Sequence, residues 1–126
     1  MMDFTNVMAV LPASDLGRAQ AFYKDKLGLE PDPEMSDTGG VVYSVGGHRF
    51  LLYETGFAGT AKNTALTLET ANLDGTMTEM RGRGVSFEEY DMPGLKTENG
   101  VAGIGTERTA WFVDSESNII AVSERS

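Results

Sequence analysis

The stretch NVMAVLPASDLGRAQAFYKDKLGLEP, at residues 6–31, decides the fold class. Its first part, residues 6–11, is a short apolar run containing valine, which predicts a strand that ends before the proline. The Asp15 side chain is suited to accept hydrogen bonds from the free backbone N–H groups of a helix N-terminus. Apolar residues then recur at helical spacing, and Gly28 suits a left-handed C-terminal cap, so the pattern predicts a helix over 15–27.

The same order of elements returns in the second half of the chain. Apolar and polar side chains alternate over residues 64–69, which predicts a half-buried strand with Leu66 and Leu68 on the helix-covered face. Asn72 follows as a second N-cap, 57 residues after Asp15, and a second helical stripe begins behind it. The two cycles indicate an internal duplication.

The remaining segments predict further strands and one long loop. Residues 91–106 contain four glycines and a proline, which predicts a long mobile loop. Strands are expected over 41–45, 48–54, 85–90, 107–114 and 118–124. The expected architecture is a single α+β domain of two βαβββ modules, about 1–60 and 61–126, whose curled mixed sheet surrounds a cleft.

The composition excludes several classes of function. The 126 residues carry 19 acidic and 10 basic side chains, so a nucleic-acid backbone would be repelled by the net charge of −9. Cysteine is absent and His48 is the only histidine, which excludes thiolate sites and histidine-rich zinc centres. The sequence has neither a run of about 18 apolar residues nor a signal peptide, so we expect a cytoplasmic protein without membrane contact.

The opening stretch resembles the vicinal oxygen chelate superfamily, in which a strand leads to Asp-Leu, then a Phe-Tyr pair, then Leu-Gly. The segment AWFVDSESNII, residues 110–120, resembles its closing motif, usually aromatic-Phe-x-Asp-Pro-x-Gly-Asn. Asp114 and Asn118 match this motif, whereas Ser115 and Ser117 replace the usual proline and glycine. The resemblance implies the glyoxalase/bleomycin resistance fold. Members include glyoxalase I, extradiol dioxygenases, fosfomycin-inactivating transferases, epimerases and bleomycin-type resistance proteins.

The resemblance also implies four strand positions at which enzymes of the superfamily hold a divalent metal with His and Glu. Here these positions carry Met8, Leu51, Ala65 and Ala121. Divalent cations of this kind require oxygen or nitrogen donors, which none of these side chains offers. We therefore expect no metal and no other cofactor, and a cleft lined by apolar groups instead.

An open apolar cleft with a few polar groups is the usual form of a small-molecule site. Trp111 is either a flat platform for a planar ligand or a buried core residue. Arg49 either anchors an anion or is solvated, and Glu69 either faces a cationic ligand or ends an exposed strand. The expected ligand-binding residues are Met8, Arg49, Leu51, Tyr53, Ala65, Thr67, Glu69, Met92, Trp111 and Ala121.

Three functions remain open at the level of the sequence. The first is metal-independent binding and sequestration of a small apolar or aromatic molecule by a homodimer, as the resemblance to bleomycin-type resistance proteins implies. The second is a glyoxalase-like lyase, isomerase or dioxygenase whose metal is held elsewhere, for example by His48, Glu54 or Glu69. The third is a non-catalytic interaction module, whose cleft would be filled by the protein's own side chains.

Overall fold

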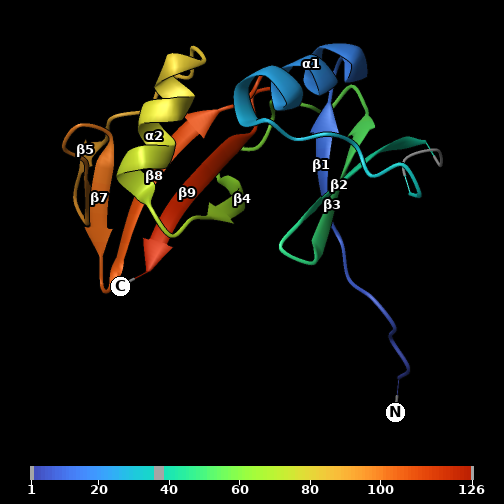
Figure 1. Cartoon of the computed structure of the whole chain (residues 1–126), viewed down its shortest axis with the longest axis horizontal. Coiled ribbons are helices and arrows are strands. Elements are labelled where there is room, and N and C mark those ends of the chain that lie inside the picture. Colours follow the sequence, from blue (N-terminus) through green and yellow to red (C-terminus); the bar gives the residue numbers. More distant parts are fainter. Residues whose placement is uncertain (1, 36–38, 126) are drawn as a thin grey trace.

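Figure 1 shows a computed structural model of the chain, in which residues 2–35 and 39–125 are described. Two main sheets stand side by side, each with one helix, and a small two-stranded hairpin flanks the second sheet. The elements are β1 (Ala9–Ala13), α1 (Leu16–Leu27), β2 (Gly40–Val45), β3 (His48–Glu54), β4 (Thr64–Glu69), α2 (Leu73–Gly82), β5 (Asp91–Met92), β6 (Leu95–Lys96), β7 (Val101–Ile104), β8 (Glu107–Val113) and β9 (Ile119–Arg125).

The first sheet has the strand order β1-β3-β2. β1 runs parallel to β3, and β2 pairs with β3 as an antiparallel hairpin. Gly46 and Gly47 form the hairpin turn with φ values of 58° and 82°, which glycine adopts without steric cost. The described part of this half contains three strands, one fewer than a βαβββ unit has.

The second sheet has the strand order β4-β9-β8-β7. β4 runs parallel to β9, and the other neighbours are antiparallel. Leu66 and Leu68 pack against the core on the helix-covered face, whereas Ala65, Thr67 and Glu69 are exposed on the other face, as the alternation predicts. The bounds of β8 and β9 agree with the expected closing hairpin to within a residue.

Both helices begin where the sequence predicts. The Asp15 carboxylate accepts a hydrogen bond from the Arg18 backbone N–H at 3.0 Å, and the Asn72 side chain does the same for Gly75 at 3.0 Å. α1 ends at Gly28, whose φ of 70° confirms the left-handed cap. These caps satisfy backbone groups that the helix ends would otherwise leave without a partner.

One hydrophobic core joins the two halves of the chain. Tyr23 of α1 stacks on Tyr43 of β2, with ring centroids 5.3 Å apart, and Phe22 stacks on Phe112 of β8 at 6.4 Å. Buried residues from α1, α2 and the helix-covered faces of both sheets form one cluster, in which Met77 and Met80 lie on the inner side of α2. The opposite face of each sheet carries no helix, and we call it the open face.

Three expected segments differ from the structure. The first strand covers 9–13 instead of 6–11 and includes Pro12, which is tolerated because β1 is an edge strand. Residues 85–90 do not form a strand; only Phe87 makes an isolated bridge, to Phe112. The glycine-rich segment 91–106 contains β5, β6 and β7 rather than a continuous loop.

The α+β class is confirmed by two helices and two mixed sheets. Among the described residues, no helix has the length and apolar character needed to cross a membrane.

Candidate functional site

The open face of the first sheet exposes apolar side chains that no other part of the described chain covers completely. Val10 of β1 is 54% exposed and Tyr53 of β3 is 39% exposed. Leu51 of β3 is the cross-strand partner of Val10, and Tyr53 follows Leu51 by two residues on the same face of β3. Met8 is half-buried and directly precedes β1. These residues therefore form one apolar strip, as the period-two pattern predicts.

A hollow of about 470 Å³ opens between the start of β3 and the end of β4. We call it the β3–β4 hollow. It brings together Arg49, Thr67 and Glu69, with His48 beside them, over Phe50, Leu66 and Leu68. Its two charges are paired outside the hollow, since Arg49 lies 3.5 Å from Asp32 and Glu69 lies 3.3 Å from Arg125. The hollow therefore presents an apolar floor with compensated charges at its rim.

A second hollow, of about 280 Å³, lies between the open face of β1 and the start of β4. We call it the β1–β4 hollow. Val10, Pro12, Ala65 and Ile119 contribute apolar wall, and Thr64 lines it as well. The Thr64 hydroxyl accepts a hydrogen bond of 3.2 Å from the indole nitrogen of Trp111, so the tryptophan lies directly behind this wall.

Trp111 and Ala121 are cross-strand partners on the open face of the second sheet. Both are buried, with exposed fractions of 8% and 3%, because Tyr90 and Leu95 pack against them. The Tyr90 ring meets the Trp111 ring edge to face, with centroids 5.6 Å apart. Met92 lies on the same covering segment and is 50% exposed. The indole ring is thus not an open platform in this structure.

The side chains do not fit the metal that the superfamily implies. Met8, Leu51, Ala65 and Ala121 offer one thioether and three hydrocarbon groups, which are poor ligands for a hard divalent cation. No group of three or more His, Cys, Asp or Glu residues close enough to hold a metal occurs within residues 2–35 and 39–125.

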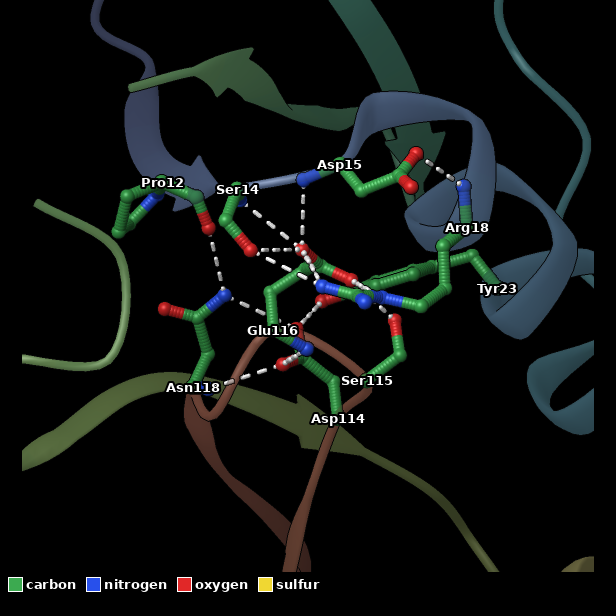
Figure 2. Close-up of polar contacts among 9 residues, drawn as sticks. All are labelled: Pro12, Ser14, Asp15, Arg18, Tyr23, Asp114, Ser115, Glu116 and Asn118. Carbon is green, nitrogen blue, oxygen red and sulfur yellow. Dashed lines mark hydrogen bonds and ion pairs between the residues drawn. The ribbon is translucent and has the colours of Figure 1, made fainter. Parts of the chain in front are cut away.

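Figure 2 shows a polar cluster that the sequence did not lead us to expect, centred on Glu116. The Glu116 side chain is fully enclosed and accepts hydrogen bonds from the backbone N–H groups of Ser14 and Asp15, at 2.9 and 3.0 Å. Arg18 donates to the same carboxylate through Nε at 2.9 Å and Nη2 at 3.0 Å, and the Ser115 hydroxyl donates at 2.7 Å. The hydrogen bonds from Arg18 contribute most to lowering the pKa of Glu116 from its ordinary 4.5 to about 2.

Asp114 completes this cluster on its buried side (Figure 2). Its carboxylate accepts hydrogen bonds from the Tyr23 hydroxyl at 2.7 Å and from the backbone N–H groups of Glu116 and Asn118. The Asn118 side chain donates to the carbonyl of Pro12 at 3.0 Å. Burial and the adjacent carboxylate raise the pKa of Tyr23 well above its ordinary range.

The cluster joins the turn at 114–118 to the end of β1 and the start of α1. Its polar side chains form hydrogen bonds with one another and with the neighbouring backbone. It is therefore a structural junction.

The spacing Asp114-x-x-x-Asn118 was a usable signal for the turn. Arg18 lies on the exposed side of α1, and nothing in the local sequence indicated that Glu116, 98 residues away, would reach it.

The fold and part of the sequence resemble known proteins. Residues 3–46 match the family described as bleomycin resistance protein-like N-terminal. A comparison with curated proteins finds no match.

Three solved structures superpose over nearly the whole chain. The antibiotic binding protein TnmS3 from Streptomyces sp. CB03234 is 21% identical with a TM-score of 0.69, and 100% of both chains is covered. Lactoylglutathione lyase from Agrobacterium tumefaciens is 18% identical with a TM-score of 0.68, covering 97% of this chain and 95% of the other. The fosfomycin resistance protein FosX from Listeria monocytogenes is 13% identical with a TM-score of 0.64, covering 99% and 94%. These likenesses confirm the expected fold.

Proposed function

We propose that this chain, which has the fold of the vicinal oxygen chelate superfamily, binds a small apolar or aromatic molecule without the help of a metal. The observation that carries the proposal is the replacement of every implied metal position by Met8, Leu51, Ala65 and Ala121 on apolar open faces. Burial of an apolar ligand on such surface is favourable by about 25 cal/mol per Å². The likeness to an antibiotic binding protein supports this function more than catalysis.

The binding surface combines the β3–β4 hollow, the β1–β4 hollow and the apolar strip of the first sheet. The two hollows lie at opposite ends of β4, since one contains Ala65 and the other contains Glu69. Thr67 and Tyr53 supply hydroxyl groups that orient a ligand, whereas Arg49 and Glu69 lie near its rim. The mechanism is stoichiometric binding, which lowers the free concentration of the ligand.

A homodimer is part of the proposal, because the N-terminal segment exposes apolar side chains beyond the folded body. Met2, Phe4 and Val7 are all at least three-quarters exposed, and Figure 1 shows this segment running away from both sheets. Exposed apolar groups gathered in one extended segment are typical of an interface. A second copy of the chain is the occupant that we propose for this segment.

Binding is tested by titrating the purified protein with planar aromatic compounds while following Trp111 fluorescence, with calorimetry for the stoichiometry. We expect saturation at one ligand per site and no change after treatment with a chelator. Ala65→Glu places a carboxylate in the β1–β4 hollow and should weaken binding at least tenfold, because an unpaired charge resists burial.

Ala21→Glu makes the same change on the exposed side of α1 and should leave binding unchanged. Failure of every compound class to saturate would count against the proposed function. Recovery of one tightly bound divalent ion per chain after metal loading would instead favour the glyoxalase-like enzyme.

A further inference from the structure

The segment that follows α2 folds back over the open face of the second sheet. We call residues 88–98 the cover. Tyr90 and Leu95 of the cover pack on a small separate cluster formed by Ala102, Trp111 and Ala121. This contact occupies the surface where a ligand would reach the indole ring.

The floor beneath the cover combines one large ring with two small side chains. Ala102 on β7 and Ala121 on β9 belong to the same buried cluster as Trp111 on β8, and Ala121 is the cross-strand partner of Trp111. Tyr90 presents its ring to Trp111 at an angle of 83°, a preferred arrangement for two aromatic rings. The protein's own tyrosine thus fills the space that a planar ligand would fill.

The same face contains a hydroxyl group that lacks a partner. Ser123 follows Ala121 by two residues on β9, so both side chains point to the open face. Ser123 is 1% exposed, and its Oγ has no hydrogen-bond partner among the described residues. A buried hydroxyl without a partner costs free energy, and a ligand that supplies a partner recovers it.

Besides the packing of Tyr90 and Leu95, the cover is attached to the second sheet by the Glu88 N–H, which donates to the Trp111 carbonyl at 2.8 Å; its other polar contacts are local. Its strands β5 and β6 have two residues each and pair only with one another in the described structure. The Glu89 carboxylate accepts hydrogen bonds from the Thr97 hydroxyl at 2.6 Å and from the Gly100 N–H at 2.9 Å. Asn99 and Gly100 both have positive φ, at 53° and 83°, and form a tight turn after the cover, which hydrogen bonds between the backbones of Glu98 and Val101 close.

We propose that the Trp111 face of the second sheet is a closed binding site for a planar aromatic molecule carrying one hydrogen-bonding group. Tyr90 occupies the site in the absence of the ligand, and the ligand enters by displacing the cover. The molecule stacks on Trp111 between Ala102 and Ala121, and its polar group pairs with Ser123. This inference rests on the proposed function and assigns the ligand class and the entry step.

The test uses N-phenyl-1-naphthylamine, a neutral planar probe with one N–H group that becomes fluorescent in apolar surroundings. Tyr90→Ala removes the competing ring and should tighten probe binding by roughly tenfold, which corresponds to the interaction free energy of one aromatic pair. It should also increase acrylamide quenching of Trp111, the only tryptophan. Tyr90→Phe keeps the ring and should behave as the wild type does. Ser123→Ala should weaken probe binding severalfold.

Equal probe affinity in Tyr90→Ala and Tyr90→Phe would overturn the inference while leaving the proposed function intact, because the probe would then bind elsewhere. Absence of probe binding to all variants would contradict both. Unchanged affinity in Ser123→Ala would remove that residue from the site.

A measurement on the wild type avoids any folding defect of the variants. Saturation with the probe should accelerate hydrogen exchange at the Glu88 and Gly100 amides, which are bonded to the Trp111 carbonyl and the Glu89 carboxylate in the closed form. Retained or increased protection at both amides would overturn displacement of the cover.

Discussion

At the scale of single residues, the most consequential side chain is Glu116, because it is a fully enclosed carboxylate far in sequence from its partners. Its oxygens receive the first backbone N–H groups near the α1 N-terminus, where a negative charge is stabilised by the helix dipole. Arg18 supplies the opposite charge while remaining half exposed. The cluster therefore stabilises the charged form of Glu116 strongly.

We predict that Glu116→Gln lowers the free energy of unfolding by about 2–3 kcal/mol at pH 7. The folded pKa of about 2 lies below the ordinary 4.5, so this stabilisation is present above pH 4.5 and is lost as the pH falls toward 2. Denaturant unfolding at pH 7 and at pH 3 should show the difference between wild type and variant shrinking in acid.

Glu79→Gln is the matched control, since Glu79 pairs with Arg83 on the exposed side of α2. Its cost should stay below about 0.5 kcal/mol at both pH values. An equal loss in the free energy of unfolding for the two variants would show that the burial of Glu116 does not strengthen its interactions.

At the scale of elements, the turn at 114–118 contains the clearest local conflict between sequence and backbone. Ser117 has a φ of 68°, in the left-handed region, at the position where the superfamily motif has glycine. A side chain at such a position brings its Cβ close to the backbone and strains the turn. The strain persists because the hydrogen bonds of Asp114 hold the turn on both sides.

We predict that Ser117→Gly raises the free energy of unfolding by about 0.5–1 kcal/mol, because glycine adopts this φ without the steric penalty. Ser115→Gly makes the same change two residues earlier and should lower stability, since the Ser115 hydroxyl donates to Glu116. Thermal unfolding of both variants compares the two effects. A loss of stability in Ser117→Gly would contradict the assignment of strain.

Sequence predicted the elements that carry their own local signals. Asp15, Gly28 and Asn72 fixed the helix ends, and the alternation around Leu66 fixed the faces of β4. The strand expected over 85–90 failed because only Phe87 finds a partner on β8, and pairing depends on a neighbour that local pattern does not specify. The alternation placed Ala65, Thr67 and Glu69 on the exposed face of β4, but the burial of Trp111 depends on Tyr90, a contact no periodicity encodes.

At the scale of the whole molecule, the two halves share one core instead of having a core each. Phe112 of the second half is fully buried and contacts Phe22 of the first half and Phe87 of the second. The Glu116 cluster adds a polar connection at one end of this shared core. The halves should therefore unfold together.

We predict that Phe112→Ala lowers the free energy of unfolding by about 3–5 kcal/mol, the usual cost of removing a buried aromatic ring. In the wild type, Trp111 fluorescence should report the second half and should change in the same denaturant range as the far-ultraviolet circular dichroism of the whole chain. A fluorescence transition at clearly lower denaturant would show that the second half unfolds alone.

The junction in Figure 2 has a consequence for the covalent continuity of the chain. The halves are linked along the backbone through residues 55–63, most of which are exposed, while Glu116 and Arg18 connect them through space. A protease that nicks this linker would cut the polypeptide without separating its parts. The two fragments would migrate as a single species under native conditions and separate only in denaturant. The linker at 55–63 is therefore a suitable position at which to divide the chain for a split reporter.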